Sequence, residues 1–175
     1  MAQIWNLDKA HSELEFKVKH MMISNVKGLF ENFDVVIEGG DEHFEHAKIS
    51  AAIETGSIAT KNEQRDQHLK SGDFFDVQTY PEIKFVSTNI EKKSDDEFAV
   101  TGDLTIKGVT KPITLKVEYG GIAVDPWGNS KVGYTFSGKL NRSDYGLTWN
   151  AALETGGVMV SEDVKLTGDV QFSKS

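Results

Sequence analysis

Arg65-Asp66-Gln67-His68-Leu69-Lys70-Ser71-Gly72-Asp73-Phe74-Phe75-Asp76, continuing through Tyr80-Pro81-Glu82-Ile83-Lys84-Phe85, is the stretch that decides the fold. The sequence on both sides of it alternates between apolar and polar residues, whereas this stretch predicts one short helix over residues 61–71. Thr60 and Glu63 have the spacing of a capping box, so Thr60 is expected to cap the helix. Gly72 is expected to end it. The helix therefore interrupts an otherwise all-β chain.

Apolar residues that recur with a period of two predict half-buried strands before and after the helix. The apolar positions are Leu14, Phe16, Val18 and His20; Phe33, Val35 and Ile37; Ile49, Ala51 and Ile53; Ile83 and Phe85; Phe98, Val100, Leu104 and Ile106; Ile113, Leu115, Val117 and Tyr119; Val132, Tyr134, Phe136 and Leu140; and Val164, Leu166, Val170 and Phe172. Ser24 to Gly28 is expected to be a break. Eight or nine antiparallel strands follow, in a barrel or a sandwich.

A barrel and a sandwich differ in their interiors. A sandwich fills itself with side chains, while an eight-stranded barrel is wide enough to hold one small ligand. Gly102, Gly138 and Gly168 fall on the apolar face in mid-strand. They either mark bulges that bend the strands or leave room for a guest molecule, and the sequence does not choose between these interpretations.

Composition excludes several classes of function. The chain has 175 residues, which is most simply one domain over residues 1–175, and it has no cysteine, which excludes disulfides and cysteine-bound zinc. A formal net charge of −8 with scattered Lys and Arg argues against nucleic acid and anionic membranes as main partners. The longest apolar runs are too short for stable membrane insertion. The N-terminus has no signal-peptide pattern, so the chain as given is expected to be cytoplasmic, or periplasmic if a leader was removed.

Five motifs in order resemble the YceI-like family of lipid-binding proteins. They are Trp5-x-x-Asp8-x-x-His11-Ser12 with Phe16-x-Val18-x-His20-Met21; Val26-x-Gly28-x-Phe30; Arg65-Asp66-x-His68-Leu69 with Phe74-Phe75 and Tyr80-Pro81-x-Ile83-x-Phe85; Gly102-x-Leu104-Thr105-Ile106-x-Gly108-Val109-Thr110-x-Pro112; and Asn141-Arg142-x-Asp144-Tyr145-Gly146-Leu147. The resemblance implies an all-β, eight-stranded antiparallel lipocalin-like barrel with a short helix near its mouth. It also implies an elongated apolar cavity for a polyisoprenoid, quinone or fatty-acyl chain, and a homodimer.

With this resemblance, the apolar strand faces become the expected lipid-binding cavity. Its residues are Phe16, Val18, Phe33, Val35, Ile53, Phe85, Val100, Leu104, Leu115, Phe136 and Leu166. The expected mouth, where a head group would lie, comprises His20, Arg65, His68, Phe74 and Phe75. No cofactor is expected apart from a bound isoprenoid or other lipid.

Other residues have simpler interpretations. His43 and His46 are expected in a solvated hairpin tip rather than in a metal site, because a metal needs three or four converging ligands. His20 lies on an apolar face, where a hydrogen-bonded core histidine is favoured over a ligand contact. Arg142 is expected to hold a strand-end turn through Asp144 or a neighbouring carboxylate.

Arg65 and His68 share one face of the predicted helix. They are expected either to form an ion-pair network with Asp66, Asp73 or Asp76, or to provide a polar rim for a ligand head group.

Catalysis is not favoured. The sequence lacks the G-x-S-x-G pattern and any cysteine nucleophile, and its paired carboxylates Asp95-Asp96 lie in a polar turn. The sequence therefore predicts a non-catalytic binding or carrier protein for an amphipathic lipid. The alternative is a small enzyme that acts on a lipid in the cavity and uses His20, Arg65 or His68 as acid–base groups.

Overall fold

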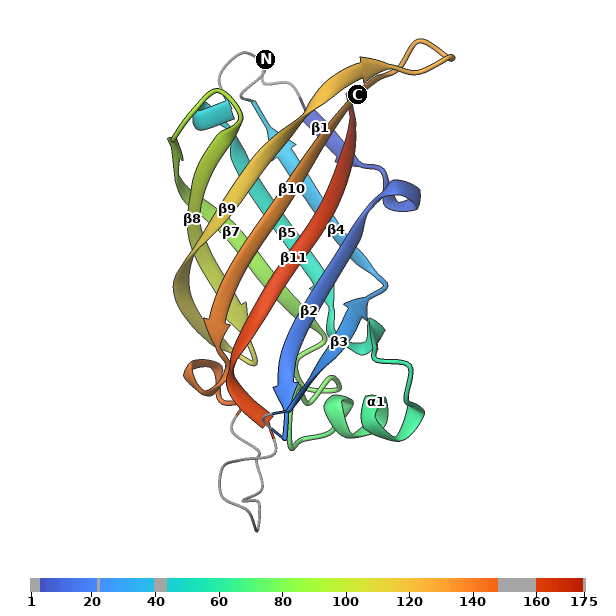
Figure 1. The fold of residues 1–175 in the computed structure, drawn as a ribbon, viewed down its shortest axis with the longest axis vertical. Helices are drawn as coiled ribbons and strands as arrows, with labels where there is room; N and C mark the ends of the chain where they lie inside the picture. Colours follow the sequence, from blue (N-terminus) through green and yellow to red (C-terminus); the bar gives the residue numbers. More distant parts are fainter. Residues whose placement is uncertain (1–3, 22, 40–43, 148–159, 175) are drawn as a thin grey trace.

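The structure is a computed structural model that describes residues 4–21, 23–39, 44–147 and 160–174. Its elements are β1 (Ile4–Leu7), η1 (Lys9–His11), β2 (Glu13–His20), β3 (Ser24–Phe30), β4 (Phe33–Glu38), η2 (Phe44–His46), β5 (Lys48–Glu54), η3 (Thr55–Ser57), β6 (Ile58–Ala59), α1 (Glu63–Lys70), β7 (Glu82–Lys92), β8 (Glu97–Ile106), β9 (Val109–Val124), β10 (Ser130–Asn141), η4 (Arg142–Tyr145) and β11 (Val160–Lys174). They form a tilted cylinder of strands with α1 at one end (Figure 1).

The cylinder is an eight-stranded antiparallel barrel, as predicted. Strand neighbours run in the order β1-β4-β5-β7-β8-β9-β10-β11, and β11 pairs back onto β1 to close the circle. β11 also pairs with β2, β2 with β3, and β3 with β6. β1 and β2 therefore share one position in the barrel, as do β3 and β4, and β5 and β6. Closure of the ring distinguishes the barrel from the sandwich that the sequence left open.

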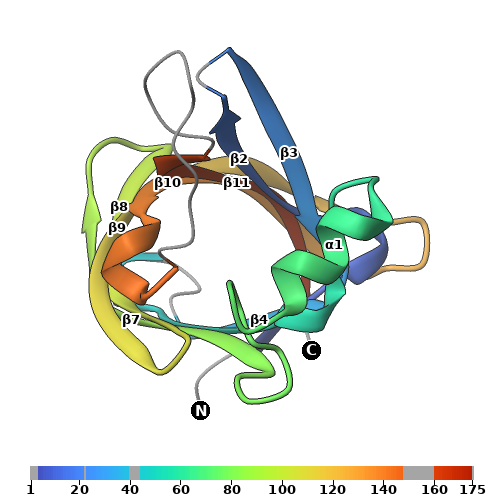
Figure 2. The same cartoon turned by 90° about the horizontal axis from the view of Figure 1, so that it is seen from below.

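The barrel wall is incomplete at the end that carries α1. In the described part of the chain, β5 pairs with β7 only as far as Glu54 and Glu82, and β6 pairs with β3 alone. The connection between β6 and β7, which contains α1, lies at this opening (Figures 1 and 2). Thr55 ties it to the wall, since its N–H donates to Pro81 O (3.0 Å) and its Oγ1 donates to Tyr80 O (2.8 Å). This end is the mouth of the barrel.

The helix is capped by a different residue from the one expected. Asn62 is the N-cap, and its side chain accepts from the Arg65 N–H at 3.0 Å. Thr60 precedes the helix and bonds instead to the Asp66 carboxylate, so the predicted capping box is wrong. The physical reason is that Asn is a stronger N-cap than Thr. Asn62 also has a capping partner three residues ahead. The helix ends at Lys70 with Gly72 two residues beyond, close to the predicted end.

The predicted break over residues 24–28 is also wrong. β3 runs unbroken from Ser24 to Phe30 and pairs with β2, and Gly28 lies opposite Phe16. A glycine inside a strand has the same sequence signal as a turn glycine. Here the glycine accommodates a neighbouring ring.

Aromatic side chains close the end opposite the mouth. Phe44 is buried and packs on Phe98 of β8, with ring centroids 4.8 Å apart, and on Tyr134 of β10 at 4.9 Å. Tyr134 packs in turn on Phe172 of β11 at 6.1 Å. His43 lies outside the described residues. His46 is exposed, as expected for a solvated tip, whereas the neighbouring Phe44 is buried, because η2 turns its ring into the barrel.

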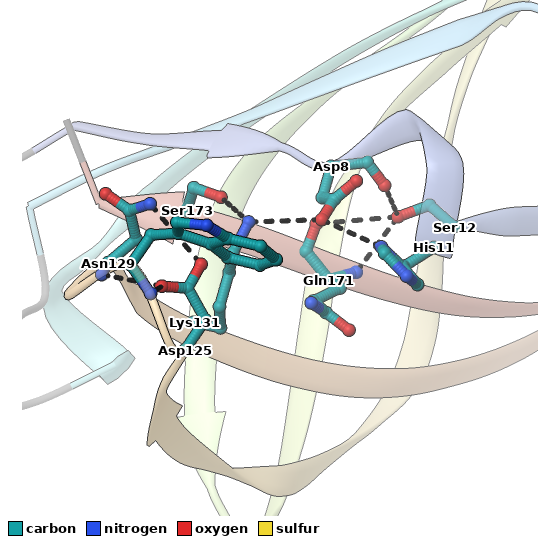
Figure 3. Close-up of polar contacts among 9 residues, drawn as sticks. Asp8, His11, Ser12, Asp125, Asn129, Lys131, Gln171 and Ser173 are labelled. Atoms are coloured by element: carbon teal, nitrogen blue, oxygen red, sulfur yellow. Dashed lines mark hydrogen bonds and ion pairs between the residues drawn. The ribbon is translucent and has the colours of Figure 1, made fainter.

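A group of polar contacts, called the clasp here, links the position that β1 and β2 share to the neighbouring strands β10 and β11 (Figure 3). The Asp8 carboxylate accepts from Lys131 Nζ at 3.1 Å and contacts His11 Nδ1 at 3.0 Å. Lys131 also donates to Ser173 Oγ at 2.5 Å. Ser12 Oγ donates to Asp8 O (2.7 Å) and accepts from the Gln171 N–H (3.0 Å). The clasp thus joins η1 to β10 and β11, near the point where the barrel closes.

We expect Asp8→Asn to lower the free energy of unfolding by about 1–2 kcal/mol at neutral pH, because Asp8 loses two charge-assisted hydrogen bonds. The hydrogen bond with His11 is the main cause that holds the pKa of Asp8 below its ordinary value; burial opposes it and Lys131 adds to it. Since the folded-state pKa lies below the unfolded value of about 3.9, this stability is present above that value and is lost as the pH falls through the folded-state pKa.

Urea denaturation of wild type and Asp8→Asn between neutral and strongly acidic pH measures this effect. Asp163→Asn is the matched control, because Asp163 pairs with Lys139 on the open surface and its loss should cost less than about 0.5 kcal/mol. A difference between wild type and Asp8→Asn that does not shrink in acid would contradict the assignment.

Candidate ligand-binding cavity

Two adjacent cavities occupy the barrel interior. The mouth cavity has a volume of about 460 Å³ and is lined by residues from both the strands and α1. The deep cavity has a volume of about 110 Å³ and is lined only by residues of the barrel strands. The alternation of apolar and polar residues explains this interior, because one phase of every strand faces inward.

The two cavities share four lining residues, called the waist below. Leu14, Ile53, Leu104 and Leu166 line both of them. These residues come from β5, from β8 and from the neighbouring strands β2 and β11. A chain that extends from the mouth cavity into the deep cavity would contact these aliphatic side chains.

The structure places all eleven predicted cavity residues along this path. Phe16 and Val18 line the mouth cavity; Phe33, Val35, Phe85, Val100, Leu115 and Phe136 line the deep cavity; Ile53, Leu104 and Leu166 line both. Their contact with a lipid stays a prediction.

Four of the five predicted mouth residues line the mouth cavity: Arg65, His68, Phe74 and Phe75. They come from α1 and from the segment that follows it. His20 ends β2, opposite Ser24 and Val160 in the sheet, and its side chain lies outside the described part of the structure.

Arg65 is held in place through a threonine. Its Nε donates to Thr60 Oγ1 at 2.7 Å and its Nη2 donates to Thr60 O at 2.6 Å. The N–H and Oγ1 of Thr60, which is almost fully buried, both donate to Asp66 Oδ1. In the described parts of the chain, no ion pair of Arg65 with a carboxylate is found. The guanidinium therefore keeps N–H groups for another acceptor at the cavity wall.

His68 belongs both to a network and to the rim, the two interpretations that the sequence left open. Its Nε2 lies 2.9 Å from Asp73 Oδ2, and its ring packs edge-on against Phe74 with centroids 5.1 Å apart. The same side chain lines the mouth cavity. The pairing with Asp73 orients the ring, and Phe74 supplies an apolar surface beside it.

Arg142 is a second cation at the mouth and is only 3% exposed. Its Nε donates to Ser161 O (2.8 Å), Nη1 to Leu147 O (2.6 Å) and Nη2 to Val160 O (3.2 Å). Burial lowers the pKa of this guanidinium, and the Glu162 carboxylate, 3.9 Å from Nη2, opposes that effect. The expected turn is therefore held largely by carbonyl oxygens, which join the end of β10 to the start of β11.

The charge at the mouth differs in sign from that of the whole chain. Lys19, Arg65 and Arg142 line the mouth cavity, and no Asp or Glu does so among the residues that the structure describes. The formal net charge of the chain is −8. Such a site can bind a ligand whose apolar part fills the barrel and whose polar end accepts hydrogen bonds or carries negative charge.

The three mid-strand glycines do not share one explanation. Gly102 lies opposite Ser87, beside a register shift between Ser87 and Asn89, which agrees with the bulge interpretation. Gly138 and Gly168 sit in regular register with Leu166 and Phe136. The bulge interpretation is therefore wrong for these two.

Residues 5–172 match the YceI-like domain family. The chain belongs to this family. It is 48% identical over 172 residues to UPF0312 protein SAS2572 of Staphylococcus aureus (strain MSSA476), covering 98% of each chain. The expected family is thereby confirmed.

Solved structures share the YceI-like fold. A Campylobacter jejuni YceI protein is 34% identical, with a TM-score of 0.73 and 96% of each chain covered. Burkholderia cenocepacia BcnA is 21% identical, with a TM-score of 0.82 over 94% of this chain and 98% of that one. A polyisoprenoid binding domain from Saccharophagus degradans is 14% identical, with a TM-score of 0.75 and 98% of each chain covered. The last two likenesses concern the fold alone.

Sequence reasoning missed several residues of this YceI-like cavity. Thr60, Asn62 and Gln64 line the mouth cavity but lie outside any strand. Arg142 also lines it, although the sequence favoured a strand-end turn over a place at the mouth. Their polar types and irregular positions carry no periodic signal. Leu14, Ile83, Ile106, Leu140 and Val164 also line it, and their positions on the apolar phase could have identified them.

Two further features of the described residues bear on other functions. No helix there has the length and apolar character needed to span a bilayer. Within the same residues, no group of three or more His, Asp or Glu side chains is arranged to hold a metal ion.

Proposed function

We propose that this YceI-like protein is a non-catalytic binding or carrier protein for an amphipathic lipid with a long apolar tail. The observation that carries the proposal is the pair of adjacent cavities inside a closed barrel, with apolar strand residues along both and cationic side chains at the mouth cavity only. Burial of apolar surface contributes about 25 cal/mol per Å². A tail enclosed by the barrel therefore supplies most of the binding free energy.

The mouth supplies the orientation. Arg65 and His68 lie on α1 and line the cavity wall together with Phe74 and Phe75. A polar head group at this end would exchange water for hydrogen bonds with fixed partners, whereas at the closed end it would meet Phe44, Phe98 and Tyr134. The tail therefore enters first, and the head group stays at the mouth.

An isoprenoid quinone, a polyprenyl derivative and a fatty-acyl lipid all satisfy this description. The Saccharophagus degradans protein of the same fold is a polyisoprenoid binding domain, and this likeness supports an isoprenoid tail. The homodimer and the cellular compartment expected from the sequence stay predictions.

We expect the protein purified from its own host to retain a lipid. Native mass spectrometry should detect a complex heavier than the 19.4 kDa chain, and organic extraction followed by mass analysis should identify the ligand. Protein that carries no lipid and takes up no quinone, polyprenol or fatty acid would contradict the carrier proposal. Chemical turnover of a bound lipid that is abolished by His68→Ala would instead support an enzyme.

A further inference from the structure

Four glycines on the interior side of the barrel lie directly beneath bulky side chains of neighbouring strands. A Cβ atom built on each would come closer than real Cβ atoms do: 2.2 Å from Phe16 Cζ at Gly28, 2.5 Å from Phe85 Cζ at Gly102, 2.4 Å from Leu115 Cδ2 at Gly138, and 2.2 Å from Phe136 Cε1 at Gly168. These side chains therefore occupy the space that a Cβ would take, and at Gly102 the Val86 carbonyl oxygen is equally close, at 2.5 Å.

The same four side chains line the cavities. Phe16 borders the mouth cavity, and Phe85, Leu115 and Phe136 border the deep cavity. Each one lies against the wall on one side and faces the cavity on the other. The contact with a glycine and the position at the cavity are independent observations that concern the same side chains.

We propose that these glycines determine the length of lipid tail that the protein accepts, because they let the side chains above them lie flat against the wall. Gly102, Gly138 and Gly168 thereby keep the deep cavity open, and Gly28 does the same for the mouth cavity. This inference rests on the proposed lipid-binding function. These glycines would select for tail length without touching the ligand. The protein should therefore prefer tails that are long enough to extend past the waist.

Gly168 offers the clearest case. It lies opposite Phe136 in the β10–β11 register and opposite Leu14 in the β11–β2 register. A Cβ at this position would be 2.2 and 2.3 Å from two atoms of the Phe136 ring and 3.1 Å from the Glu13 carbonyl oxygen. The backbone of β2 cannot yield easily, so the ring must move away from the wall and toward the deep cavity.

The deep cavity is small enough for this displacement to matter. With a volume of about 110 Å³, it leaves little space beside a ring that has swung inward. A tail would then stop at the waist and leave its last methylene groups outside apolar surroundings. Each methylene lost in this way weakens binding about fourfold.

The test measures the affinity of the full-length protein for decanoic, tetradecanoic and octadecanoic acids by calorimetry, with geraniol and geranylgeraniol as isoprenoid probes. We expect Gly168→Ala to bind octadecanoic acid at least about tenfold more weakly than wild type, while decanoic acid changes by less than about twofold. Adding Phe136→Leu to Gly168→Ala should restore the long-chain affinity, because a smaller side chain no longer meets the new Cβ.

Gly133→Ala is the matched control. It lies in the same strand as Phe136, and its Cβ would meet nothing closer than the Val170 carbonyl oxygen at 4.0 Å. Its chain-length preference should equal that of wild type. Phe136→Ala provides a second test, which can be used even if the Gly168→Ala variant does not fold. Removing the ring should widen the deep cavity and raise the preference for octadecanoic over decanoic acid severalfold.

The outcomes separate the inference from the function on which it rests. A wild-type protein that binds none of the acids or alcohols would overturn both. A wild-type protein that binds them, with an unchanged chain-length preference in Gly168→Ala or, should that variant not fold, in Phe136→Ala, would overturn the inference and leave the lipid-binding function standing.

Discussion

Replacing Arg142 by methionine is expected to lower the free energy of unfolding by about 3–5 kcal/mol, a large part of the stability of an ordinary domain. The substitution keeps an unbranched apolar stem but leaves the carbonyl oxygens of Leu147, Val160 and Ser161 without their donor. Each buried acceptor without a partner costs about 1–3 kcal/mol. The loss should also separate the start of β11 from the end of β10 and deform the mouth.

Urea denaturation followed by circular dichroism measures this loss. Lys139→Met is the matched control, because it removes a cation from the exposed face of β10, the strand that ends just before Arg142, where the ion pair with Asp163 should contribute less than about 1 kcal/mol. Arg142→Lys should recover only part of the stability, since one ammonium group cannot reproduce the planar fork of donors. A loss below about 1 kcal/mol in Arg142→Met would show that water replaces the guanidinium and that the side chain has no structural role.

The second large effect concerns binding. Arg65→Gln is expected to weaken the binding of octadecanoic acid roughly ten- to a hundredfold, because a hydrogen bond to a charged group contributes about 1.5–3 kcal/mol. The same variant should bind octadecanol, which has the same tail and no charge, within about threefold of wild type. Arg65 is suited to this role because its Thr60 contacts leave N–H groups for a ligand at the cavity wall.

Competition binding with the acid and the alcohol tests this prediction. Lys70→Gln is the control: it removes a positive charge from the last turn of the same helix, at a residue that does not line the mouth cavity. Equal loss for both ligands in Arg65→Gln would indicate that Arg65 supports the shape of the mouth rather than contacting a head group. Loss of acid binding in Lys70→Gln would indicate a general effect of charge.

The strands were predictable because their signal is local. Alternation places Phe16, Val18 and Leu166 on one side of their strands whatever the neighbours are, and that side had to be the interior. The helix was recognisable for the same reason, as a segment without alternation and with a glycine at its end. The sequence did not predict details that depend on competition between neighbouring residues. The helix cap is an example, because Asn62 caps the helix and Thr60 does not.

What the sequence determined by itself is the inward face of most strands and the presence of one short helix, because each follows from residues close together in the chain. Only the tertiary structure decided that the sheet closes through β1 and β11, that four aliphatic residues form a waist, and that Gly168 lies beneath Phe136. These features join residues far apart in the sequence. Strand register and side-chain contact set them, and no local pattern encodes the distance between two side chains that meet across a barrel.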